Sequence, residues 1–117
     1  MATDATREVL RHFDIILRDL RMIEPRIRHE EYFCHPSIWV GNQPFIAVEA
    51  SDMVFRLRAE ARLEAWQLQG SHLWKPSGSP DTPPSTEWVR VNSRFANRWQ
   101  YFAEQALSYA EETAGSA

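Results

Sequence analysis

The spacing of the apolar residues changes twice along this chain, and no other feature limits its fold as strongly. Residues 6–23 repeat their apolar side chains every three or four positions, as one face of a helix does, and so does the closing segment from about residue 93. Between them, residues 30–58 follow a shorter, strand-like period. We therefore expect two helices that enclose an antiparallel meander. The two helical stripes are Val9, Phe13, Ile16, Leu20 and Ile23, widened by Leu10 and Leu17, and Phe95, Trp99, Phe102, Ala106 and Tyr109.

The strand-like region divides into four candidate strands, at residues 32–34, 37–40, 45–48 and 53–57. The alternation in the last of these predicts one buried face and one face that is mostly solvated. Residues 59–68 predict a short helix with Leu63 and Trp66 turned inward, and residues 88–91 predict a further strand. The expected fold class is α+β: an antiparallel sheet of about five strands, packed by N- and C-terminal helices plus one short helix.

Length and composition favour a single domain. The chain has 117 residues, of which 44% are hydrophobic and 25% charged, and this is ordinary for one globular domain. We expect one domain over residues 1–117, with a core from about residue 6 to about residue 112. Residues 70–86 contain four prolines, which a central strand cannot hold, so we expect a long surface loop there.

Charge and cysteine content narrow the range of partners and compartments. The net charge is -3 and neither half of the chain is strongly basic, so direct nucleic-acid binding is disfavoured. No apolar run approaches the length of about 18 residues that spans a bilayer, and the N-terminus lacks a signal-peptide pattern. Cys34 is the only cysteine, so no disulfide can form within the chain. We expect a cytoplasmic protein that does not associate with membranes and that binds a protein partner or a second copy of itself.

Several segments resemble, in the same order, the TfoX N-terminal domain family. Tyr32-Phe33-Cys34 is similar to the Met-Phe-Gly segment that opens the family's first strand, and residues 39–45 resemble its aromatic hairpin. Residues 53–58 are similar to the strand before its short helix, and residues 70–78 to its Gly-x-x-x-aromatic-x-Pro-x-Gly loop. Residues 88–91 and 106–110 resemble its closing strand and helix, which YjbR-like proteins share.

The resemblance covers roughly residues 6–112. It implies a fold similar to secretion-chaperone-like domains, in a family associated with regulators of competence for DNA uptake. In those regulators a C-terminal helical domain follows, which we expect this chain to lack. Many solitary relatives in the family have no defined activity.

No catalytic motif accompanies this resemblance. The chain has no nucleophile elbow, Walker loop, dinucleotide fingerprint or His-Glu-x-x-His sequence, so we expect no enzymatic activity and no cofactor. Side chains that can bind zinc gather at residues 29–35, but on one extended strand His29, Glu31 and His35 would lie about 7 Å apart and would not converge on one ion. We expect no metal site, and a buried, unreactive thiol at Cys34.

Five tryptophans are many for one small core, so we expect some of them at the surface. Trp39, on the expected hairpin, and Trp74, in the Pro-rich loop beside Lys75, are the best candidates for a binding surface. In the alternative interpretation, Trp74 anchors the loop to its own domain. The tryptophans expected in the core are Trp66, Trp88 and Trp99.

Three arginines could extend this surface toward an acidic partner. Arg56, Arg58 and Arg90 fall on the expected solvated face of the sheet, and internal salt bridges to Glu49 or Glu87 explain them equally well. The leading hypothesis is a small, non-enzymatic protein-interaction or regulatory domain. The alternatives are a small-molecule-binding domain with a pocket between the sheet and the loop 70–86, and an enzyme without a recognisable motif.

Overall fold

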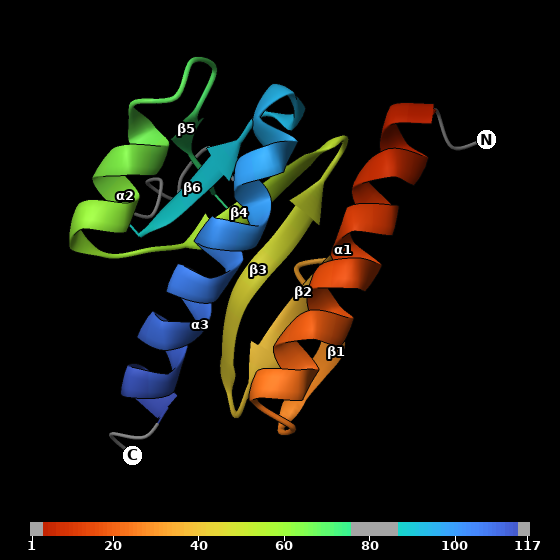
Figure 1. Cartoon of the computed structure of the whole chain (residues 1–117), viewed down its shortest axis with the longest axis vertical. Helices are drawn as coiled ribbons and strands as arrows, with labels where there is room; N and C mark the ends of the chain where they lie inside the picture. Colours follow the sequence, from red (N-terminus) through yellow and green to blue (C-terminus); the bar gives the residue numbers. More distant parts are fainter. Residues whose placement is uncertain (1–3, 76–86, 115–117) are drawn as a thin grey trace.

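The fold is α+β, as the sequence predicts: a six-stranded antiparallel sheet with N- and C-terminal helices and one short helix. The computed structural model describes residues 4–75 and 87–114. In the sheet the strands follow the order β1-β2-β3-β4-β6-β5 (Figure 1). The elements in chain order are α1 (Asp4–Ile23), β1 (Ile27–Tyr32), β2 (His35–Val40), β3 (Gln43–Glu49), β4 (Asp52–Arg56), α2 (Ala59–Trp66), β5 (His72–Leu73), β6 (Trp88–Val91), the 3-10 helix η1 (Ser93–Arg98) and α3 (Trp99–Ala114).

Two-residue turns join the first four strands, and they correct the expected boundaries. Phe33 and Cys34 form the first turn, with φ of 50° and 67°, where we expected a strand. Tyr32 pairs with His35 across this turn, and the strand before it begins at Ile27. The alternating pattern did not reveal β1 because three successive residues of this edge strand, His29 to Glu31, are exposed, so burial imposes no period on them.

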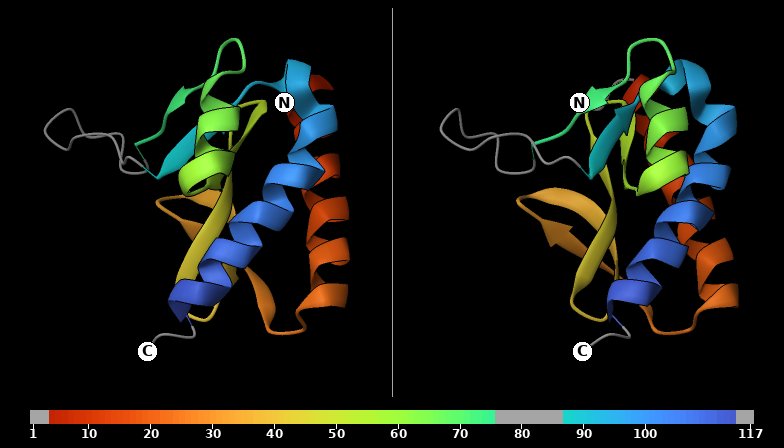
Figure 2. Two further views of the ribbon diagram at one scale, coloured as in Figure 1. Left: turned by 60° about the vertical axis from the view of Figure 1, so that its left-hand side comes forward. Right: turned by 90° about the vertical axis from the view of Figure 1, so that its left-hand side faces the viewer.

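The helices cover one face of the sheet and enclose the main core (Figure 2). α1 buries its stripe from Val9 to Leu20, but Ile23 and Leu10 are exposed, against expectation. The buried stripe ends at Leu20 because the chain leaves the helix at Ile23 and turns into β1. A β-bulge adds to this core: Ile38 pairs with Ile46 and Trp39 pairs with Pro44, so the intervening Phe45 is unpaired and is buried in the same core cluster.

The opposite face of the sheet is partly buried, which corrects the prediction of a mostly solvated face. Val54 and Ala47, from neighbouring strands, pack with Trp74 and Trp88 in a second apolar cluster. Trp74 follows β5, a strand that we placed in the surface loop; β5 pairs with β6, and the Trp74 N–H donates to the Trp88 carbonyl at 3.0 Å. The rest of the expected loop, residues 76–86, lies outside the described residues.

The closing helix begins as predicted, since the Asn92 side chain accepts a hydrogen bond from the Arg94 N–H at 2.9 Å and so caps η1. Helix α3 then follows and buries Trp99, Phe102 and Ala106 against the sheet. Among the described residues, no helix is both long and apolar enough to cross a membrane.

Candidate functional site

The two tryptophans predicted to form a binding surface are held by their own domain. Trp74 is only 3% exposed, so the interpretation that it anchors its loop is correct and the expectation that it is exposed is wrong. Its indole Nε1–H donates to a Glu49 carboxylate oxygen at 2.5 Å. Trp39 is half-buried beneath the Arg28 guanidinium, 5.0 Å from its ring centroid. Lys75, the last described residue before the gap, is partly exposed.

Arg90 lies in a network of carboxylates on this same face. Its Nε donates to Asp52 at 2.9 Å, and its Nη1 donates to Glu49 at 3.1 Å, so one guanidinium bridges two acidic side chains. The other oxygen of Asp52 accepts the Ser93 N–H at 3.0 Å. These bonds tie the turn after β3 to β6 and to the start of η1.

Arg56 and Arg58 are also paired within the chain. Arg56 lies 3.3 Å from Glu87 and donates to Gln43 at 2.6 Å. Arg58 forms a two-pronged ion pair with Glu112, from α3. The structure therefore supports the interpretation that the three predicted arginines form internal salt bridges. Arg58, however, pairs with Glu112 and not with Glu49 or Glu87.

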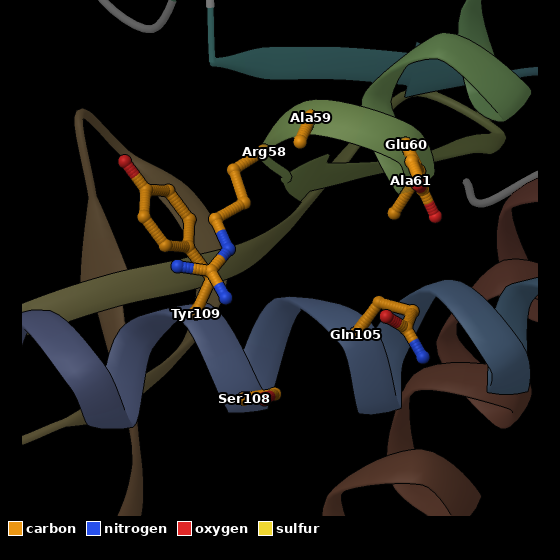
Figure 3. Close-up of a pocket in the computed structure, with 7 residues that line it drawn as sticks. All are labelled: Arg58, Ala59, Glu60, Ala61, Gln105, Ser108 and Tyr109. Carbon is orange, nitrogen blue, oxygen red and sulfur yellow. The ribbon is translucent and has the colours of Figure 1, made fainter.

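A polar pocket of about 270 Å³ lies between the start of α2 and α3. In Figure 3 the Arg58 side chain lies beside the ring of Tyr109, and Gln105 and Ser108 come from α3. The Tyr109 hydroxyl donates to Glu87; this bond, together with burial, raises the pKa of Tyr109 above its ordinary value of 10.0. No histidine or cysteine is among the described residues that line the pocket, so Ser108 has no such base there to activate it.

An apolar groove of about 640 Å³ lies between α2 and β5, and we call it the α2 groove. Leu63 and Trp66 stand on its wall, 56% and 48% exposed, whereas we expected both in the core. The residues that line the groove are Ala59, Arg62, Leu63, Trp66 and Leu73.

The inward face of α2 explains why these two side chains are exposed. Ala61 and Ala65, four positions apart, are the buried residues of this helix, and they let it pack closely against β6 and α3. Ala59, Leu63 and Trp66 then share another side of the helix, at intervals of four and three residues. The spacing of the two alanines was the signal in the sequence, but size alone suggests that leucine and tryptophan are the buried residues.

The metal-ligating side chains near residue 30 do not converge. The His29 ring contacts Phe13, on the face covered by helices, whereas the His35 ring contacts Trp74, on the opposite face of the sheet. Cys34 is exposed at the first turn, which corrects the prediction of a buried thiol. Within residues 4–75 and 87–114, no group of three potential metal ligands is present.

No model of a known protein family, no curated protein and no solved structure matched the chain.

Proposed function

We propose that this chain is a non-enzymatic protein-interaction domain and that it docks partners in the α2 groove. The observation that carries the proposal is the orientation of α2, which turns its small alanines inward and leaves Leu63 and Trp66 half exposed around an apolar opening. Exposed apolar patches of this kind mark interaction sites, and tryptophan is among the residues most enriched in interface hot spots.

The chemistry of the groove defines the partner. Four of its five lining residues are apolar and the fifth is Arg62, so it fits a peptide segment with a large apolar side chain next to a carboxylate. The resemblance to the TfoX N-terminal family, which is itself a prediction, favours a regulatory role.

Selection of peptides from a random library on the immobilised protein tests this proposal. We expect the selected peptides to combine a large apolar residue with Asp or Glu. Trp66→Ala should weaken their binding about 30-fold, as truncation of a hot-spot residue costs about 2 kcal/mol. Met22→Ala removes an exposed apolar side chain from α1 and is the matched control, expected to leave binding unchanged. Peptides that bind Trp66→Ala as tightly as the natural chain would refute the docking site.

The size of the groove favours one alternative, a small-molecule-binding domain. About 640 Å³ lies within the range of about 300–1,000 Å³ that is typical of ligand pockets. A thermal-shift screen of small apolar acids distinguishes the two functions: stabilisation that Trp66→Ala abolishes, without peptide binding, would assign the groove to small molecules.

A further inference from the structure

Strand β1 forms one edge of the sheet, and β2 is its one neighbour among the described strands (Figure 1). In an antiparallel pair, alternate residues direct their backbone groups toward the neighbouring strand or away from it. The two-residue turn makes Tyr32 and His35 a hydrogen-bonded pair. The even-numbered residues of β1 therefore bond to β2, and the odd-numbered residues direct their N–H and C=O groups outward.

The bonds of Ile27 agree with this assignment. Its N–H donates to the Glu24 carbonyl at 3.2 Å and its carbonyl accepts from Arg21 Nε at 3.2 Å, so both outward groups of this first residue of β1 already have partners. In the described part of the chain, no other bond reaches this outer edge. The outward backbone groups of His29 and Glu31 thus remain available to another strand.

We propose that a second copy of the chain pairs with this edge, β1 antiparallel to β1, across a two-fold axis at His29. In this register the outward backbone groups of His29 in each copy bond to those of His29 in the other, and Arg28 of each copy lies opposite Glu30 of the other. Glu31 lies opposite Ile27, whose backbone groups keep their bonds to Glu24 and Arg21. Opposite side chains in an antiparallel pair stand on the same face with Cβ atoms about 4.5–5.5 Å apart, so two ion pairs form around the axis. The two sheets then continue into one.

The charges of β1 favour this pairing register over the registers in which the two-fold axis lies at a neighbouring residue. An axis at Arg28 would place arginine opposite arginine, and an axis at Glu30 or Glu31 would place glutamate opposite glutamate. Charged side chains usually keep a sheet edge from pairing. Here the alternation of Arg28 and Glu30 about His29 is self-complementary, which makes a second copy the occupant that the edge fits.

The two charged side chains are exposed on the face of the sheet where this contact forms. Arg28 and Glu30 are 41% and 54% exposed and pair with each other along the strand. A second Arg28 nitrogen donates to the Gly41 carbonyl at 2.7 Å and the guanidinium lies over Trp39, both on the side of β2. Dimerisation therefore requires the Arg28 side chain to turn toward the outer edge and to exchange Glu30 on its own strand for Glu30 across the axis.

Sedimentation equilibrium tests the proposal without reference to any unidentified partner. A single strand pair buries less than a standard interface, so we expect a dimer with a Kd on the order of 0.1 mM. Arg28→Glu and Glu30→Arg each place like charges opposite each other, and each should weaken dimerisation about tenfold. A mixture of these two variants should restore dimerisation, since each supplies the charge that the other lacks. Trp66→Ala should leave the dimer unchanged, which separates this proposal from the function of the α2 groove.

A disulfide provides the second readout. In a Cys34→Ser background, His29→Cys should form a cross-linked dimer on mild oxidation, because hydrogen-bonded opposite residues have Cα atoms about 5.5 Å apart. Arg26→Cys, outside the strand, should not. A wild-type chain that stays monomeric at about 1 mM, or charge variants that associate like the wild type, would overturn the proposal.

Discussion

Removal of the Asp52 carboxylate should destabilise the fold more than any surface substitution. Asp52 is 7% exposed, and its two oxygens accept hydrogen bonds from Arg90 Nε at 2.9 Å and from the Ser93 N–H at 3.0 Å. Asp52→Ala deletes both bonds and leaves the Arg90 guanidinium, whose side chain is mostly buried, with Glu49 as its remaining carboxylate partner.

The structure sets the size of this loss. A hydrogen bond to a charged group contributes about 1.5–3 kcal/mol, and breaking a buried ion pair costs about 3–5 kcal/mol. Because Glu49 still compensates Arg90 at 3.1 Å, we expect a value near the lower end, about 3 kcal/mol in the free energy of unfolding. For a domain of this length, this corresponds to a decrease in Tm of about 10 °C.

Urea unfolding followed by tryptophan fluorescence measures the effect. Asp14→Ala, at an exposed position of α1, is the control and should change the free energy of unfolding by less than about 0.5 kcal/mol. A double-mutant cycle with Arg90→Met should give a coupling energy of at least about 1 kcal/mol. A loss below about 1 kcal/mol for Asp52→Ala, or strict additivity in the cycle, would contradict the network described here.

Two further predictions concern the tyrosine at the polar pocket and the first hairpin turn. The bond to Glu87 raises the pKa of Tyr109, so its contribution to stability is fully present below about pH 10 and declines as the pH rises through the raised value. Tyr109→Phe should therefore cost about 1 kcal/mol at pH 7 and make the decline in stability above about pH 10 shallower, and an unchanged alkaline slope would contradict this. At the turn, the double substitution Phe33→Asn and Cys34→Gly supplies residues that adopt positive φ readily. It should add about 1 kcal/mol to the free energy of unfolding measured in urea. A loss of stability would mean that the contact of Phe33 with Tyr32 outweighs the backbone strain.

The sequence predicted the elements that bury one side, because one-sided burial gives their apolar residues a regular spacing. Helix α1 and helix α3 carry apolar residues every three or four positions because each buries one side against the sheet. The central strands β3 and β4 are buried on both faces, and they carry short continuous apolar runs instead. The polar strand β1 has no such pattern, so the sequence predicts strand where the structure has the turn at Phe33 and Cys34.

The candidate site was predicted less well, because it depends on contacts between distant segments. Trp74 and Trp88 are both apolar residues near an expected loop, and their sequence does not say that they cover Val54 and Ala47. In the sequence, the predicted arginines are ordinary charged residues of a sheet. Only the tertiary structure brings their partners Asp52, Glu87 and Glu112 within bonding distance.

By itself, then, the sequence determined the α+β class and the chain order of most elements, since local hydrophobic period reports which side of each element is buried. Tertiary structure alone decided which large side chains stay outside. Helix α2 packs through Ala61 and Ala65 because the space beside β6 and α3 admits small side chains, and that space is set by neighbours far away in the chain. Leu63 and Trp66 are exposed for this reason, and with them the surface that we propose for partner binding.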